Sequence, residues 1–179
     1  MSKVSLSDLD ERLLPGGPLH GRVVHFYDVE ADLLDSHRYV DWLELLHPDI
    51  SYEMPVRTTE VLAAGDGVSE MAFFSENRSS METRVRRLQT EFAWAETPPS
   101  RTRHFVTNVT ILGEGADGVL HVRANLLVNR TRGEGGNQML TANRTDELVP
   151  EPVRLFTIRR RRLLLDQTVV AATNLSVFL

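Results

Sequence analysis

The second half of the chain alternates apolar and polar residues, and this pattern restricts the possible fold more than any other feature. Between residues 120 and 129 the apolar positions are Leu120, Val122, Ala124, Leu126 and Val128. Because successive side chains of a strand point to opposite faces, this spacing predicts a strand with one buried face. Further strands are predicted at 104–112, 138–148 and 153–166, separated by turns rich in glycine or proline. Short turns between consecutive strands indicate an antiparallel meander.

The first half of the chain shows the period of helices instead. One apolar stripe predicts a helix and consists of Val23, Phe26, Tyr27, Ala31 and Leu34. Glu30 interrupts this stripe, so it lies either at the edge of the stripe or next to a buried partner. A second helix is predicted over residues 39–46, with Ser36 as its cap and Pro48 as its end. A third helix is predicted over residues 81–88.

The order of these elements predicts a single α+β domain. A strand is predicted at residues 50–57, and residues 58–77 are expected to form a long excursion. Residues 1–20 are polar and are interrupted by prolines and glycines near their end, which predicts an N-terminal arm and leaves 21–179 as one domain. Helices followed by a meander indicate that the helices pack on one face of a sheet.

The charge balance and the absence of cysteine exclude several classes of function. The 179 residues include 25 acidic and 20 basic side chains, which gives a net charge of −5 and argues against a nucleic-acid partner. A chain without cysteine has no disulfide, no thiolate nucleophile and no cysteine-ligated zinc or iron–sulfur site. No apolar run approaches the roughly 20 residues of a membrane span, and residues 1–10 lack the apolar core of a signal peptide. We therefore expect a cytoplasmic protein without a membrane partner.

Two pairs of residues near the N-terminus have the spacing of functional sites. His20 and His25 form a His-x4-His pair, but Gly17 stands where a carboxylate or amide would complete a metal site, so exposed or capping histidines are favoured. His37 and Asp41 lie four residues apart beside other carboxylates and share one helix face. Charged residues at this spacing more often form a solvated face than an acid–base pair.

Four consecutive arginines, Arg159–Arg162, lie in the middle of the last predicted strand. Because side chains alternate along a strand, the run is expected to split into two pairs on opposite faces. The apolar residues on both sides indicate a buried strand with a charged middle. Such a position suits ion pairing with an acidic partner across an interface, and it favours a protein partner over a nucleic acid.

Three blocks of sequence resemble the small (β) subunit of the Rieske-type aromatic ring-hydroxylating dioxygenases, most closely those of the biphenyl, toluene and naphthalene dioxygenases. The first block is Val29–Asp35, followed by Tyr39, Trp42 and the segment Tyr52–Arg57. The second runs from Trp94 to His104 and on to Asn108, and the third is Asn174–Leu179. The resemblance covers residues 21–179.

The resemblance implies a cystatin-like or nuclear-transport-factor-2-like (NTF2-like) cone, in which three helices pack on a curved, mainly antiparallel sheet. It also implies a hetero-hexamer of three large (α) and three small subunits. The large subunit would carry a Rieske [2Fe–2S] cluster and a mononuclear non-haem iron, and would convert aromatic hydrocarbons to cis-dihydrodiols. It would use O2 and electrons from NAD(P)H that arrive through a reductase and a ferredoxin.

In this family the small subunit is mainly structural, and the residues of this chain agree. A Rieske centre needs two cysteines beside two histidines, and this chain has no cysteine. The sequence also lacks an Asp-x-x-His-x4-His run that would supply two histidines and a carboxylate to a mononuclear iron. We therefore predict no catalytic, cofactor-binding or metal-binding residue in this chain. The aromatic substrate is not predicted, because the large subunit would contact it.

His104 supports an alternative function. Enzymes that share the cone fold, such as scytalone dehydratase, carry out acid–base chemistry inside the cone. His104, paired with Asp41 or Tyr27, is a candidate general base for a stand-alone, cofactor-free dehydratase or isomerase. An open pocket at His104 would favour this enzyme, whereas a cone filled with side chains would favour the structural subunit.

The middle block also supplies the expected contact with the large subunit. Interfaces favour Trp and Arg as anchors, and consecutive prolines stiffen the segment that carries them. The predicted interface residues are Trp94, Pro98, Pro99, Arg101, Arg103 and His104.

Overall fold

A computed structural model describes residues 13–57, 68–89, 100–132, 137–167 and 178–179 of the chain. Its helices are α1 (Pro18–Asp35), α2 (Tyr39–Leu43) and α3 (Arg78–Leu88). Its strands are β1 (Leu46–Arg57), β2 (Val68–Glu76), β3 (Arg101–Glu114), β4 (Leu120–Thr131), β5 (Asn137–Glu151) and β6 (Leu155–Leu165). The α+β prediction with three helices is confirmed.

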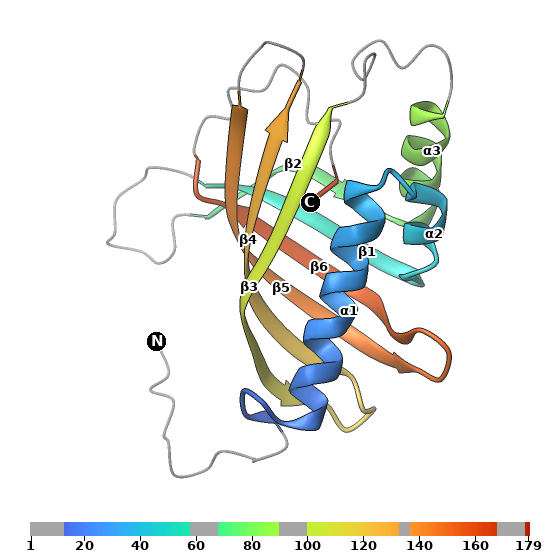
Figure 1. The fold of residues 1–179 in the computed structure, drawn as a ribbon, viewed down its shortest axis with the longest axis vertical. Helices are drawn as coiled ribbons and strands as arrows, with labels where there is room; N and C mark the ends of the chain where they lie inside the picture. The colour runs from blue at the N-terminus through green and yellow to red at the C-terminus, as the bar shows by residue number, and fades with distance from the viewer. Residues whose placement is uncertain (1–12, 58–67, 90–99, 133–136, 168–177) are drawn as a thin grey trace.

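The six strands form one sheet in the order β2-β1-β6-β5-β4-β3. Strands β3 to β6 are the predicted antiparallel meander, and β1 joins it by pairing in parallel with β6. Strand β3 contains a bulge at Asn108, whose φ of 54° lies in the left-handed region, and the register with β4 shifts there. Bulges bend the strand that carries them, and the sheet curves around α1 (Figure 1).

The core lies between the helices and the inner face of the sheet. The predicted apolar stripe of α1 is buried there except for the half-buried Ala31, and so are the alternating residues Leu120 to Val128 of β4. The opposite face of β4 is mostly exposed, from His121 to Asn125. We call these two faces of the sheet the inner face and the outer face, and this one-sided burial is typical of an antiparallel sheet.

Several local predictions differ from the structure. Helix α1 begins at Pro18, because proline is favoured in the first helical turn. Ser36 does not cap α2: its backbone N–H bonds to Asp32 at the end of α1, and Arg38 precedes α2. Pro48 lies within β1 rather than at the end of a helix. The predicted excursion contains β2, which was missed because residues 58–77 show no clear alternation.

Candidate functional site

The inner face carries a buried ionic cluster of four residues: Glu30 from α1, Arg144 and Asp146 from β5, and Arg161 from β6. Each residue is at most 3% exposed. Asp146 and Arg161 are direct cross-strand partners, and Glu30 reaches them from the helix that lies over the sheet. Two arginines and two carboxylates have no net charge, so each buried charge has opposite charges beside it.

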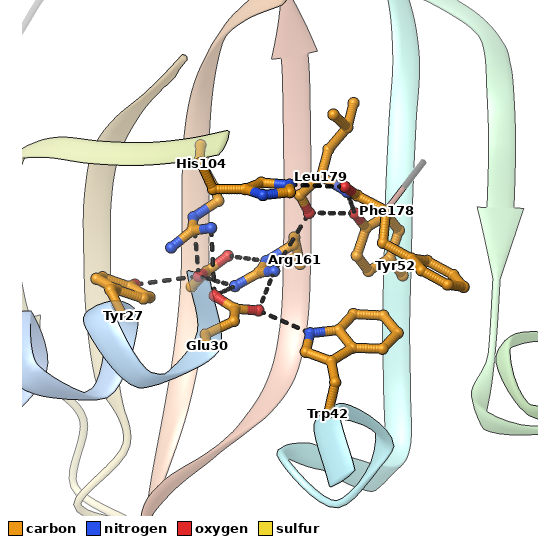
Figure 2. Close-up of polar contacts among 10 residues, drawn as sticks. Tyr27, Glu30, Trp42, Tyr52, His104, Arg161, Phe178 and Leu179 are labelled. Atoms are coloured by element: carbon orange, nitrogen blue, oxygen red, sulfur yellow. Dashed lines mark hydrogen bonds and ion pairs between the residues drawn. The ribbon is translucent and has the colours of Figure 1, made fainter. Parts of the chain in front are cut away.

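Arg161 is the centre of the ionic cluster (Figure 2). Its Nη1 and Nη2 donate to the two carboxylate oxygens of Glu30 at 2.6 and 2.9 Å. Its Nε and Nη2 donate to the two oxygens of Asp146 at 3.0 and 2.8 Å. One guanidinium group thus forms a bidentate ion pair with each of two carboxylates, and bidentate pairs are the strongest arrangement of this interaction.

Two aromatic residues complete the ionic cluster from the helices. The Tyr27 hydroxyl donates to Asp146 Oδ2 at 3.0 Å, and Trp42 Nε1 donates to Glu30 Oε1 at 3.2 Å. The guanidinium of Arg144 lies 4.3 Å from the centroid of the Tyr27 ring. These contacts tie α1 and α2 to the middle of the sheet.

Electrostatic interactions in the ionic cluster keep Glu30 and Arg161 charged and the neighbouring Tyr27 neutral at neutral pH. Burial alone would raise the pKa of Glu30, but the charges of Arg161 and Arg144, with hydrogen bonds from Arg161 and Trp42, lower it to about 2. Burial and the nearby Asp146 raise the pKa of Tyr27 well above its usual value. Although burial lowers the pKa of Arg161, the charges of Asp146 and Glu30 raise it well above the usual value. A general base needs a pKa near the working pH, so these three groups are suited to structure rather than proton transfer.

His104 lies beside this cluster with both ring nitrogens in contact with oxygen atoms. Its Nδ1 is 2.6 Å from Asp35 Oδ1, and its Nε2 is 3.0 Å from the backbone carbonyl oxygen of Phe178. Its backbone N–H also donates to Asp35 Oδ2. Burial would raise the pKa of Asp35, but the hydrogen bonds and charge of His104 lower it. His104 therefore joins β3 to α1 and to Phe178.

The prediction that His104 pairs with Asp41 or Tyr27 is wrong. Asp41 pairs with Arg38 at the surface, with 2.7 Å between the carboxylate and Nη2, and both side chains are more than half exposed. Tyr27 donates to Asp146 instead. Asp35 is the carboxylate that meets His104, and neither side chain is more than 8% exposed.

Phe178 and Leu179 occupy the space next to His104 (Figure 2). The ring of Phe178 lies 4.5 Å from Trp42 and 5.4 Å from Tyr39 between centroids. The Tyr52 hydroxyl donates to the backbone oxygen of Leu179, whose N–H donates back to that hydroxyl at 3.3 Å. Phe178 and Leu179 are at most 2% exposed. Among the described residues, Asp35, Phe178 and Leu179 thus occupy both ring nitrogens of His104 and the space beside it.

Burial also determines the acidity of Tyr52. Burial raises the pKa of Tyr52 to about 12, although the charges of Arg161 and Arg84 act to lower it. Tyr52 therefore remains a neutral hydroxyl at neutral pH and holds Leu179 by hydrogen bonds. It is not a proton acceptor for a reaction.

The remaining histidine candidates lie apart from this interior. His20 Nε2 is 3.1 Å from the carbonyl oxygen of Val109, and His25 is exposed on α1. His37 contacts the Tyr39 hydroxyl rather than Asp41. Within the described ranges, no group of three histidines or carboxylates is arranged to hold a metal ion. In the same ranges, no helix is long and apolar enough to cross a membrane.

The structure describes only three of the six predicted interface residues. Trp94, Pro98 and Pro99 lie outside the described residues. Arg101 and Arg103 are exposed on β3, and Arg103 lies 3.7 Å from the Asp35 carboxylate that holds His104. His104 itself points into the chain, so its side chain contributes to the interior.

The arginine run does not split into two pairs. Arg161 alone is buried, and Arg159, Arg160 and Arg162 are partly or largely exposed. The register between β5 and β6 shifts between Glu147 and Leu148, so Ile158 and Arg161 both lie on the inner face although they are three residues apart. The bulge adds one residue to the alternation, and sequence periodicity does not reveal it.

Comparison with known proteins agrees with the fold. The chain matches the family model described as "Ring hydroxylating beta subunit" over residues 29–172. It is 36% identical to the benzene 1,2-dioxygenase subunit beta of Pseudomonas putida, over 89% of this chain and 88% of that protein. It is 34% identical to the biphenyl 2,3-dioxygenase subunit beta of Rhodococcus jostii over the same shares.

Solved structures place the fold in the same group. A naphthalene 1,2-dioxygenase structure superimposes with a TM-score of 0.81 at 23% identity, over 97% of this chain and 89% of that chain. A putative scytalone dehydratase from Novosphingobium aromaticivorans superimposes with a TM-score of 0.57 at 15% identity, over 82% of this chain and 83% of that chain. The NTF2-like fold is therefore confirmed. On the family match and the identity to these relatives, the chain belongs to the family of ring-hydroxylating dioxygenase beta subunits.

Proposed function

We propose that this chain is the non-catalytic structural subunit of an aromatic ring-hydroxylating dioxygenase. The observation that carries the proposal is the filled interior around His104. Asp35 and the Phe178 carbonyl occupy both ring nitrogens, and Phe178 and Leu179 occupy the neighbouring space. A histidine that is bonded on both sides has no nitrogen directed at a substrate, so a stand-alone dehydratase or isomerase is not favoured.

The oxygenation chemistry would belong to a large α subunit. There a Rieske cluster and a mononuclear iron would add both atoms of O2 to an aromatic ring, with two electrons and two protons, to give a cis-dihydrodiol. The names of the relatives, which include benzene, biphenyl and chlorobenzene dioxygenase beta subunits, support an aromatic hydrocarbon as the substrate class. The absence of cysteine agrees with a cluster held by the partner.

The assembly we propose contains three large and three small subunits. Its electrons would come from NAD(P)H through a reductase and a ferredoxin, and this supply favours the cytoplasm. Arg101 and Arg103 are suited to the contact with the large subunit, because they are exposed on β3. The neighbouring Trp94, Pro98 and Pro99 remain part of the proposed interface.

Co-purification of the tagged chain from its native host tests this function. We expect a brown, iron-containing hetero-oligomer with a larger chain that carries cysteines and histidines. Native mass spectrometry gives the subunit ratio, and metal analysis gives the iron content per large chain. A colourless, iron-free homo-oligomer would contradict the proposal.

A further inference from the structure

The outer face of the sheet contains a pocket on the side opposite to the side chains of the buried ionic cluster and of His104. It has a volume of about 380 Å³ and lies over β3 to β6. The side chains that matter for its chemistry are Leu112, His121, Thr145, Glu147, Arg160 and Arg162. None of the described helices covers these positions, since the helices pack against the inner face.

Two arginines line this pocket, and one of them, Arg162, has a side chain without a carboxylate partner among the described residues. The guanidinium group of Arg162 makes no hydrogen bond or ion pair with any residue in the described part of the chain, although its backbone pairs with Glu53 of β1 and Thr145 of β5. Arg160 is 53% exposed and lies 3.7 Å from Glu53, which is a long contact. The carboxylate of Glu147 is already bound by Arg159 at 3.1 Å. The guanidinium groups of Arg160 and Arg162 therefore retain donors for an external anion.

A third arginine extends the charge along the outer face. Arg162 pairs across the ladder with Thr145, and Thr145 pairs with the exposed Arg123. Strands lie about 4.8 Å apart, so the backbones of Arg123 and Arg162 are separated by about 10 Å, with Thr145 between them. Arg123 also has no hydrogen-bond or ion-pair partner among the described residues. This local positive charge contrasts with the net charge of −5 of the whole chain.

Exposed apolar side chains lie on the same face. Leu112 lines the pocket and is 56% exposed, and Phe105 and Met139 further along the strands are 49% and 62% exposed. Arginine, methionine and aromatic residues are enriched in protein interfaces. A charged pocket beside apolar residues therefore fits a protein partner better than a free small anion.

We propose that this outer-face pocket is a docking site for the large oxygenase subunit, which inserts an Asp or Glu side chain between Arg162 and its arginine neighbours. A guanidinium group binds a carboxylate through two parallel hydrogen bonds. An apolar residue next to that carboxylate packs on Leu112. A second copy of this chain would have to supply the carboxylate from a different surface, and the homo-oligomeric state distinguishes it from the large subunit.

This inference rests on the proposed function and is tested separately from it. The large subunit is co-expressed with the wild-type chain, with the Arg123→Glu/Arg162→Glu variant, or with a control, Arg38→Glu/Arg86→Glu, that reverses two exposed arginines away from the outer face, one just before α2 and one on α3. Both variants change the net charge by the same amount. Circular dichroism and the thermal midpoint of each isolated chain report whether it folds.

We expect the outer-face variant to fold and to bind the large subunit at least tenfold more weakly, while the control binds like the wild type. Equal binding by the outer-face variant would overturn the docking site and leave the proposed function intact. A change in the homo-oligomeric state alone would also overturn it, in favour of a second copy as the occupant. A wild-type chain that captures no large subunit would contradict the proposed function itself.

Discussion

Arg161 and Arg162 are neighbours on β6, yet the two faces of the sheet give them opposite roles. Arg161 is completely buried and binds Glu30 and Asp146 within the chain. Arg162 is partly exposed beside the outer-face pocket, and its side chain forms no hydrogen bond or ion pair with the described residues. A buried charge must find its partner in the same fold, whereas an exposed charge remains available to another molecule. We therefore expect the ion pairs of the inner face to contribute most to stability, and we propose the outer face for assembly.

Removal of the central arginine should have the largest effect. Arg161→Met leaves the carboxylates of Glu30 and Asp146 buried without their main partner, and we expect a loss of about 3–5 kcal/mol in the free energy of unfolding. That is a large part of the roughly 5–15 kcal/mol that stabilises a typical domain. Urea denaturation measures the loss. A loss below about 1 kcal/mol would show that the ionic cluster does not hold the fold.

The second-largest effect is expected from low pH, which should weaken the stabilising contribution of the ionic cluster on the inner face. The pKa of Glu30 is about 2 in the folded chain against an ordinary 4.5, so its stabilising contribution is present above pH 4.5 and is lost as the pH falls towards 2. Such a shift corresponds to about 3 kcal/mol. The lowered pKa of Asp35 adds to the loss in the same direction.

Urea denaturation at several pH values between 2 and 6 measures this dependence, and Glu30→Gln should flatten it. The matched control is Asp117→Asn. The pKa of Asp117 is lowered by a hydrogen bond from the backbone of Val119 and by Arg159, but the group is exposed. The control should therefore retain the steep acid dependence of the wild type. The same slope in Glu30→Gln as in the wild type would contradict the assignment.

Removal of the His104 side chain, which joins β3 to Asp35 and to Phe178, should have an intermediate effect on stability. His104→Ala removes the hydrogen bonds to Asp35 and to the Phe178 carbonyl, and it leaves a buried carboxylate without its nearest partner. We expect a loss of about 1–3 kcal/mol. Thermal and urea denaturation measure it, and a His104→Gln variant that keeps a donor should recover part of the loss. An Ala variant as stable as the wild type would argue against this role.

The smallest effect is expected on the outer face. Arg160→Met removes a partly exposed contact of 3.7 Å to Glu53, and the free energy of unfolding should change by less than about 1 kcal/mol. The same denaturation experiment used for Arg161→Met measures it. A loss as large as that of Arg161→Met would remove the distinction between the two faces.

Sequence periodicity predicted the architecture because most elements repeat one pattern over many residues. The alternation from Leu120 to Val128 and the stripe from Val23 to Leu34 both correspond to buried faces. Strand β2 and the parallel pairing of β1 with β6 were missed, since pairing between distant segments leaves no local pattern.

The ionic cluster was only partly visible in the sequence. Glu30 interrupts an apolar stripe, and this interruption correctly indicated a possible buried partner. Arg144 and Asp146 alternate with the outward-facing residues of β5, so they could have been placed on the inner face. The pairing of Asp35 with His104 joins residues that are 69 positions apart, and spacing alone does not predict such a contact.

Turnover per mole of iron in the assembled oxygenase tests the central claim most directly. Complexes of the large subunit with the wild-type chain and with His104→Ala are purified to the same subunit ratio and iron content. If this chain serves structure alone, both complexes form cis-dihydrodiol at the same rate per iron, even where the variant assembles in lower yield. A tenfold or greater loss of turnover in intact, iron-loaded complexes of the variant would contradict the account.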